Sequence, residues 1–313
     1  MTEGRDDRVT RREFVGTAAA AAFLAPLLGR HGLANARSVV EMNTRSIPSS
    51  GVQLPVVGLG TWQTFDVGTS DRARRPLREV LRSFVDRGGR VVDASPMYGR
   101  AEAVVGDLAA ELDVRHSLFY ATKVWTRGRD AGIRQMETSA ERMRASPIDL
   151  MQVHNLLDVD QHLATLREWK QEGRVRYIGV THYQVSAYEA LEALIRAGDL
   201  DFVQFNYSIA TRESERRLLA VAADHGTAVI VNRPYEGGRL FRAVRRRQLP
   251  DWAAEFDCES WGQFFLKYIL GAPEVTCVIP ATSNPEHLRD NTGAGFGRFP
   301  DADLRRRMVE WIA

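Results

Sequence analysis

Four side chains of the 313-residue sequence could together protonate a carbonyl group that is being reduced. Tyr98 carries a phenol whose usual pKa is about 10, and a neighbouring ammonium lowers this pKa because it stabilises the phenolate. Lys123 could supply that ammonium, Asp93 could hold it in place, and His154 could orient the substrate oxygen. A tyrosine tuned in this way can act as the general acid for a carbonyl that receives hydride, without a metal.

The lysine content of the chain draws attention to Lys123. Only Lys123, Lys170 and Lys267 are lysines, so 39 of the 42 basic residues are arginines. The arginine proton is not removable in practice, whereas a lysine ammonium is compact and its pKa shifts readily. One of the three lysines therefore stands where the proposed chemistry needs a tunable ammonium.

These residues lie at or just after the ends of short apolar runs. The runs begin at Val56, Arg90, Leu118, Asp149, Arg176, Asp201, Ala228 and Thr276. They are rich in β-branched and aromatic residues, as strands buried on both faces are, and amphipathic helix patterns separate them. We therefore predict an α/β fold with one domain, a (β/α)8 TIM barrel, preceded by an N-terminal β-hairpin over residues 45–55.

Several of the helix patterns end in glycine just before the next strand, which is typical of a left-handed C-cap. These glycines are Gly88, Gly173, Gly198, Gly226 and Gly271. No GxGxxG motif follows any strand, and this argues against a dinucleotide site of the Rossmann kind. A longer gap before the last strand holds an insertion at about 237–259, whose basic cluster at 245–247 we interpret as a solvated loop.

The first 36 residues have the three-part order of an export signal. Arg11 and Arg12 precede an apolar, Ala-rich stretch from Val15 to Leu28, and a small-x-small site ends at Ala36. This order predicts a twin-arginine (Tat) signal, cleavage after Ala36 and a periplasmic protein with the Tat machinery as a partner. The stretch is too short for a stable membrane span, although an uncleaved anchor is the alternative. We expect a linker at 37–50 and the barrel at 51–313.

Composition excludes several classes of protein. The chain is 44% hydrophobic and 26% charged, which is ordinary for a globular protein. A formal net charge of +2 provides no strong field for nucleic acid or acidic membranes.

Cys277 lies in an apolar run and is expected in the core, with a Cys258–Cys277 disulfide as the alternative.

The motifs around the four residues resemble the aldo-keto reductase family. They are GLGTW at 58–62, VVDASPMYG at 91–99, YATKV at 120–124, IDLMQVHN at 148–155, VRYIGVTHY at 175–183, VQFNY at 203–207 and IPATSNPEHLRDN at 279–291. The resemblance implies a barrel that reduces an aldehyde or ketone with NADPH, with NAD as an alternative cofactor. It implies Tyr98 as proton donor, Lys123 and Asp93 as the residues that tune it, and His154 as substrate orienter.

The resemblance also implies a set of cofactor contacts. Gly60, Thr61 and Trp62 match the loop that meets the nicotinamide, and Gln204 matches a glutamine that holds the carboxamide. The adenosine-phosphate site would use Thr282, Ser283, Asn284, His287 and Asn291.

The chain departs from the family pattern at three of these places. Thr181 and His182 stand where Ser-Asn is common. A stacking tyrosine after the seventh strand is replaced in the stretch 232–235, so that either the stack is lost or Tyr235 takes it over. Positions often basic for the NADP 2′-phosphate are Ala281 and His287, with Arg289 nearby, so the sequence supports NADP only in part.

Trp62, Met97 and Trp125 follow the first three strands and could form an apolar substrate wall. The segment after Asn291 is expected to form a closing helix and not a long specificity loop, which would leave an open pocket that accepts a broad range of carbonyl compounds. Two other functions stay open at this point. One is a barrel that binds cofactor or senses redox state with little turnover, and the other is a metal-dependent hydrolase, against which no HxH or HExxH pair is present.

Overall fold

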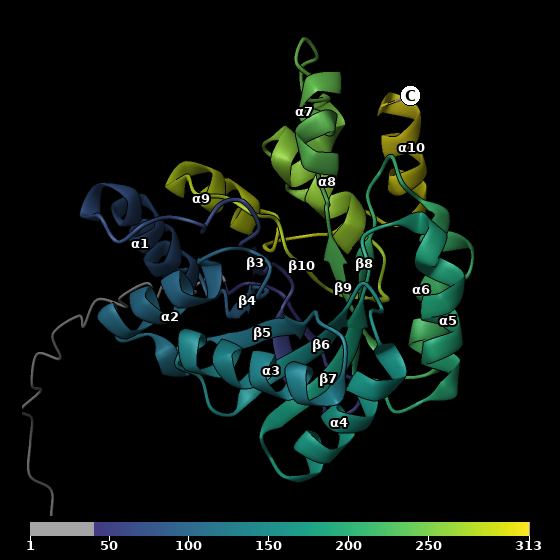
Figure 1. Ribbon diagram of the computed structural model, residues 1–313. Coiled ribbons are helices and arrows are strands. Elements are labelled where there is room, and N and C mark those ends of the chain that lie inside the picture. Colours follow the sequence, from purple (N-terminus) through teal and green to yellow (C-terminus); the bar gives the residue numbers. More distant parts are fainter. Residues whose placement is uncertain (1–40, 313) are drawn as a thin grey trace, which may run out of the picture. The chain divides into compact units, whose positions relative to one another are not determined.

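The computed structural model describes residues 41–312. The expected signal at 1–36 lies outside these residues, as does the first part of the expected linker. Within 41–312, strands and helices alternate along the chain, and in Figure 1 the strands run through the middle with helices around them.

Eight parallel strands form one sheet in which each strand pairs with its neighbour in the sequence. The strands are β3 (Leu59–Gly60), β4 (Val91–Asp93), β5 (Phe119–Val124), β6 (Ile148–His154), β7 (Val175–Thr181), β8 (Phe202–Asn206), β9 (Ala228–Asn232) and β10 (Val275–Val278). The segment leading into β3 closes the barrel, because the Gly58 N–H donates to the Val278 carbonyl over 2.9 Å and the Gly60 N–H donates to the Pro280 carbonyl over 3.1 Å. The predicted (β/α)8 barrel is confirmed, with a strand in each of the eight apolar runs.

The helices pack on the outside of the barrel through apolar faces. They are α1 (Asp71–Asp86), α2 (Ala101–Glu111), α3 (Arg129–Met143), α4 (Val159–Gln171), α5 (Tyr188–Ala197), α6 (Leu218–Asp224), α7 (Arg239–Ala243), α8 (Trp261–Leu270), α9 (Pro285–Gly293) and α10 (Ala302–Ile312). In α1 the buried residues are Leu77, Val80, Leu81 and Phe84, whose spacing of three and four places them on one helical face. The expected closing helix is α10.

Four of the five glycines predicted as C-caps have a positive φ: Gly88, Gly173, Gly198 and Gly226. Gly271 is the C-cap residue of α8, but the left-handed conformation predicted for it is wrong, because its φ is −67°. Glycine is needed there for a different reason, since a Cβ atom would lie 2.6 Å from the Pro300 carbonyl oxygen.

The predicted N-terminal hairpin is formed by β1 (Thr44–Ser46) and β2 (Gln53–Pro55), which pair antiparallel. It begins at Thr44, within the range expected to be a linker. Ile47 and Leu54 are fully buried in the apolar cluster that fills the barrel interior. Burial of one such side chain contributes about 1.5–3 kcal/mol, so the hairpin stabilises the amino-terminal end of the barrel.

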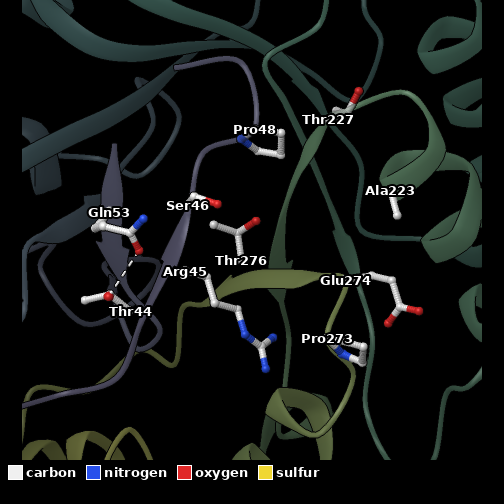
Figure 2. Close-up of a pocket in the computed structure, with 10 residues that line it drawn as sticks. All are labelled: Thr44, Arg45, Ser46, Pro48, Gln53, Ala223, Thr227, Pro273, Glu274 and Thr276. Atoms are coloured by element: carbon white, nitrogen blue, oxygen red, sulfur yellow. Dashed lines mark hydrogen bonds between the residues drawn. The ribbon is translucent and has the colours of Figure 1, made fainter. Parts of the chain in front are cut away.

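A cavity of about 490 Å³ lies beside the hairpin. Figure 2 shows its lining residues, which come from the hairpin, the end of α6 and the chain around the starts of β9 and β10. Arg45 donates to the Ala272 carbonyl over 2.7 Å and also to the carbonyls of Leu270 and Val275. The guanidinium in this cavity is therefore used to tie the hairpin to the chain between α8 and β10.

The insertion is more ordered than expected. It contains α7 and a 3-10 helix at Asp251–Phe256, while the basic cluster at 245–247 is exposed as predicted. Cys258 and Cys277 are both buried and free, so the alternative of a disulfide is wrong, and Cys277 lies in the core. In the region 41–312, no helix combines the length and apolar character needed to cross a membrane.

Candidate active site

The carboxyl-terminal ends of β4, β5 and β6 bring Asp93, Lys123 and His154 together, and the loop after β4 adds Tyr98. The Lys123 Nζ atom lies 2.6 Å from Asp93 Oδ1 and 2.6 Å from the Ala94 carbonyl oxygen. It also lies 5.0 Å from the centre of the Tyr98 ring, and that ring is 6.0 Å from the His154 ring, edge to face. The four residues predicted as catalytic therefore form one cluster.

Lys123 is fully buried, and it stays charged because of its partners. Burial by itself lowers the pKa of an ammonium, but the charge of Asp93, supported by Tyr98, outweighs burial and holds the pKa of Lys123 above its usual value. Loss of one member of such a buried pair leaves an uncompensated charge and costs about 3–5 kcal/mol.

The pKa of Tyr98 departs from the expected direction. Burial raises the pKa of Tyr98, and the lowering effect of Lys123 offsets burial only in part. The charge of Asp93 adds to the increase. Lys123 therefore lowers the pKa of Tyr98 as predicted, but the net direction is upward, because the same burial that makes the ammonium effective also disfavours the phenolate.

His154 is held as a neutral imidazole. Burial lowers its pKa to about 3, with contributions from Lys123 and His182. Its Nδ1 atom lies 3.1 Å from the hydroxyl of Ser95, which is fully buried. Sequence reasoning missed Ser95, although it lies within the motif that carries Asp93 and Tyr98.

A buried amide network supports the second carboxylate oxygen of Asp93. Gln204 Nε2 donates to Asp93 Oδ2 over 2.9 Å, and Gln152 Nε2 lies 3.3 Å from the same atom. Thr181 and Asn232 in turn donate to Gln204 Oε1 over 3.0 and 3.3 Å. Both ends of the Gln204 amide are thus engaged within the protein. Gln152 was not identified as a site residue from the sequence. Its position two residues before His154, on the same face of β6, could have indicated it.

The loop after β3 shapes the wall beside this cluster. A Cβ atom on Gly60 would lie 2.8 Å from the Ile279 carbonyl oxygen, so only glycine fits. Thr61 is buried and donates to the Asp93 carbonyl over 2.9 Å. Trp62 is 46% exposed, and Met97 and Trp125 are each 40% exposed. These three side chains follow β3, β4 and β5 and give the carboxyl-terminal end of the barrel an apolar edge beside the cluster.

The loops after β7 and β9 replace the family pattern with a stack of planar groups. His182 Nδ1 accepts from the Gln184 N–H over 3.1 Å, and its ring stacks on Tyr183 at 5.5 Å. The Arg233 guanidinium lies 5.6 Å from the Tyr183 ring. Tyr235, the alternative stacking residue, donates to Asn291 Oδ1 over 2.6 Å and packs against aromatic side chains of the insertion and α8.

Four of the five residues predicted for the adenosine phosphate lie at the start of α9. Asn284 caps α9 by accepting from the Glu286 N–H over 2.9 Å, and Thr282 accepts from the Asn284 N–H over 3.0 Å. Ser283 and His287 are exposed there, where the positive end of the helix favours an anion. Asn291 differs, because it is buried and bonded to Tyr235.

The described residues fit a nicotinamide dinucleotide by one further criterion. The Oδ1 atoms of Asn155, Asn206 and Asn232 are buried without a hydrogen-bond partner in the described part of the chain. All three residues lie at the carboxyl-terminal ends of strands. An unsatisfied buried acceptor costs about 1–3 kcal/mol, and a carboxamide NH2 group or ribose hydroxyls would supply the missing donors.

Residues 41–312 do not support a metal site in the way that they support a dinucleotide site. No group of three or more His, Cys, Asp or Glu side chains there is placed to hold a metal ion. Asp93, one of the residues that a metal site could recruit as a ligand, is committed to Lys123 and the two glutamines.

Known proteins provide an independent comparison. The chain is 27% identical over 199 residues to aldo-keto reductase YhdN of Bacillus subtilis, covering 59% of this chain and 59% of that relative's length. It is 25% identical over 319 residues to the NADH-specific methylglyoxal reductase of Escherichia coli, covering 84% of this chain and 97% of the relative.

Solved structures share the fold. An aldo-keto reductase from Bacillus halodurans superposes with a TM-score of 0.68 at 23% identity, covering 87% of this chain and 97% of that chain. An aldo/keto reductase from Klebsiella pneumoniae, solved with NADP and acetate, gives 0.68 at 21% identity, covering 87% and 96%. The family model for aldo/keto reductases matches residues 56–307. The barrel, the cluster at its carboxyl-terminal end and this match together show that the chain belongs to the aldo/keto reductase family of oxidoreductases.

Proposed function

We propose that this protein reduces an aldehyde or ketone to the alcohol with NADPH, and that Tyr98 is the general acid. The observation that carries the proposal is the buried Lys123–Asp93 pair, 2.6 Å apart, beside the Tyr98 ring and next to a neutral His154. A buried ion pair is costly to desolvate, and this one lies beside Tyr98 and His154, the groups of the cluster that could donate a proton or a hydrogen bond to a substrate.

Each residue of the cluster has a distinct part in the proposed reaction. The bound reduced cofactor supplies hydride to the carbonyl carbon. Tyr98 donates its hydroxyl proton to the carbonyl oxygen, because an alkoxide is a much stronger base than a phenolate. Lys123 keeps its charge and stabilises the phenolate that remains until solvent returns the proton. His154 is neutral and can hydrogen-bond the substrate oxygen without giving up a proton.

We propose NADP as the cofactor, with NAD as the alternative. Gly60, Thr61, Trp62, Thr181, His182 and Gln204 would surround the nicotinamide half, and Thr282, Ser283, Asn284, His287 and Asn291 the adenosine half. A Klebsiella pneumoniae structure with the same fold contains NADP, whereas the Escherichia coli relative is named as specific for NADH. Arg289, the nearby base, lies 3.6 Å from Glu79, so an ion pair competes for its charge.

The substrate class follows from the edge of the site and from the relatives. Trp62, Met97 and Trp125 offer apolar contact around a small polar centre. Relatives from Escherichia coli are named methylglyoxal reductases. We propose small aldehydes and ketones, with methylglyoxal as the first compound to assay.

The test is carbonyl-dependent oxidation of NADPH by the wild type and by Tyr98→Phe. We expect kcat to fall by about 10²–10⁴-fold, the usual contribution of a general acid, while cofactor affinity measured by fluorescence changes little. Tyr120→Phe is the matched control, because Tyr120 is buried in β5 and its hydroxyl has no partner in the described chain. Wild-type turnover in Tyr98→Phe would show that Tyr98 is not the general acid.

We also propose that residues 1–36 direct Tat-dependent export to the periplasm, with cleavage after Ala36. The support is the order of Arg11-Arg12, apolar stretch and small-residue site in the sequence. Replacement of Arg11 and Arg12 by lysine should leave the protein in the cytoplasmic fraction at its unprocessed mass. The control replaces Arg5 and Arg8 by lysine, which conserves charge outside the pair. Equal export of both variants would rule out a Tat signal.

A further inference from the structure

The loop between β4 and α2 places a serine hydroxyl behind the histidine of the site. Ser95 is fully buried, and its Oγ atom lies 3.1 Å from His154 Nδ1. Its carbonyl accepts from the Tyr98 N–H over 3.0 Å. The turn that positions the Tyr98 ring therefore also fixes Ser95 against the imidazole.

The neutral imidazole has one N–H, which sits on either Nδ1 or Nε2. With the hydrogen on Nε2, the ring can donate a hydrogen bond from the edge opposite Ser95. With the hydrogen on Nδ1, Nε2 presents a lone pair that repels a carbonyl oxygen. The choice between these two tautomers decides whether His154 can polarise a carbonyl substrate.

The contacts of Ser95 Oγ decide the direction of its hydrogen bond. The Met97 N–H lies 3.5 Å from Oγ and can only donate, so Oγ acts there as a weak acceptor. Within residues 41–312, Nδ1 of His154 is the one acceptor paired with this hydroxyl. Donation to Nδ1 is therefore the hydrogen bond that would satisfy the hydroxyl hydrogen within the described chain, and no hydrogen bond of that part of the chain engages Nε2.

We propose that Ser95 is a positioning residue that donates to His154 Nδ1 and thereby keeps the imidazole hydrogen on Nε2, directed at the substrate oxygen. The kinetic part of this inference rests on the proposed reductase function, whereas the tautomer itself does not. Sequence and spacing gave no sign of it, because an imidazole and a serine 59 positions apart meet only when β4 and β6 lie in one barrel.

The tautomer can be read directly by ¹⁵N NMR of the full chain labelled at its seven histidines. The two ¹⁵N signals that are lost in His154→Gln are assigned to the ring nitrogens of His154. In the wild type we expect a protonated-type shift at Nε2 and an unprotonated-type shift at Nδ1. Ser95→Ala should give shifts of a tautomer mixture, and Ser95→Thr, which retains a hydroxyl, should restore the wild-type pattern.

Ser139→Ala is the matched control, because Ser139 is fully buried in α3 and its hydroxyl has no partner in the described chain. It should leave the His154 shifts, KM and kcat unchanged. Ser95→Ala should lower kcat/KM by about 2- to 10-fold, which is less than the 10²–10³-fold cost of removing an oxyanion donor itself. Ser95→Thr should recover most of this loss, and thermal unfolding checks that each variant is folded.

Two results would overturn the inference: a wild-type His154 with its hydrogen on Nδ1, or the same Nε2–H tautomer in Ser95→Ala as in the wild type. The expected wild-type tautomer and its loss in Ser95→Ala, in a protein that reduces no carbonyl compound, would support the role of Ser95 and count against the proposed function. The two proposals can thus fail separately.

Discussion

At the scale of single residues, burial acts on the groups of the site in different directions. It disfavours the charged forms of Tyr98 and His154, whose pKa values shift up and down respectively. Lys123 resists the same penalty because Asp93 lies 2.6 Å away. The site therefore holds the Lys123–Asp93 ion pair beside two neutral hydrogen-bonding groups, and both neutral groups can stabilise a developing alkoxide.

These shifts predict the pH dependence of turnover. His154 has a pKa near 3 and stays neutral throughout the working range, so it adds no acidic limb. The pKa of Tyr98 is raised above its usual value of about 10, so the phenol stays protonated throughout the same range. We expect kcat/KM for reduction to change less than about threefold between pH 6 and 9, measured with a non-ionising ketone.

A bell-shaped profile centred near pH 7 would contradict this account, because it would require a group with an ordinary histidine pKa.

The lowered pKa of His154 also makes the stability of the protein depend on pH. The unfolded chain takes up a proton on His154 near pH 6.5 while the folded chain does not, so this histidine reduces stability as pH falls from 6.5 toward 3.

The sequence revealed the four central residues but not their environment. Their types and the motifs around them suffice to predict that they meet at the ends of neighbouring strands. The sign of the Tyr98 shift depends on how deeply the ring is buried, and sequence does not give that. Asn291 was placed at the cofactor because of its motif, yet its side chain accepts from Tyr235, a partner 56 residues earlier.

At the scale of elements, the hairpin and the catalytic loops occupy opposite ends of the barrel. The hairpin side chains Ile47 and Leu54 join the interior cluster at the amino-terminal end. The loops after β3 to β10 carry the predicted site at the other end. In barrels of this kind the amino-terminal face serves stability and the carboxyl-terminal face serves chemistry.

This separation predicts the effect of a hairpin substitution. Ile47→Ala should destabilise the protein by about 2–5 kcal/mol, because it removes fully buried methyl groups and leaves a cavity. Its KM and kcat at 25 °C should remain near wild type. Val52→Ala, in the same hairpin but 42% exposed, should change stability by less than about 0.5 kcal/mol. Urea unfolding and steady-state kinetics measure both quantities, and a large loss of kcat with unchanged stability would contradict the separation.

The elements were easier to predict than their ends. Eight apolar runs gave eight strands, because strands buried on both faces have an unmistakable composition. Gly271 shows why ends are harder: it caps α8 as predicted, but its φ is −67° and its lack of a side chain makes room for the Pro300 carbonyl. The helical turns of the insertion at 237–259 were missed because the segment is short and lacks a long periodic face.

At the scale of the whole molecule, the charge and the site suit a small neutral substrate. A formal net charge of +2 gives little electrostatic steering, and the edge of the site is formed by apolar side chains. Proposed export would place a reductase where reduced cofactor must be supplied with the protein or from another source. A barrel that holds its cofactor and turns over slowly is the alternative function that fits such a location.

The most direct measurement follows hydrogen from cofactor to product. The full chain is incubated with NADPH deuterated twice at C4 and with methylglyoxal or a panel of small aldehydes, and the alcohol is examined by mass spectrometry. We predict one deuterium on the former carbonyl carbon, formed over many turnovers and reduced at least 100-fold in rate by Tyr98→Phe. Alcohol without deuterium, or bound cofactor with no alcohol formed, would contradict the assignment of this protein as a carbonyl reductase.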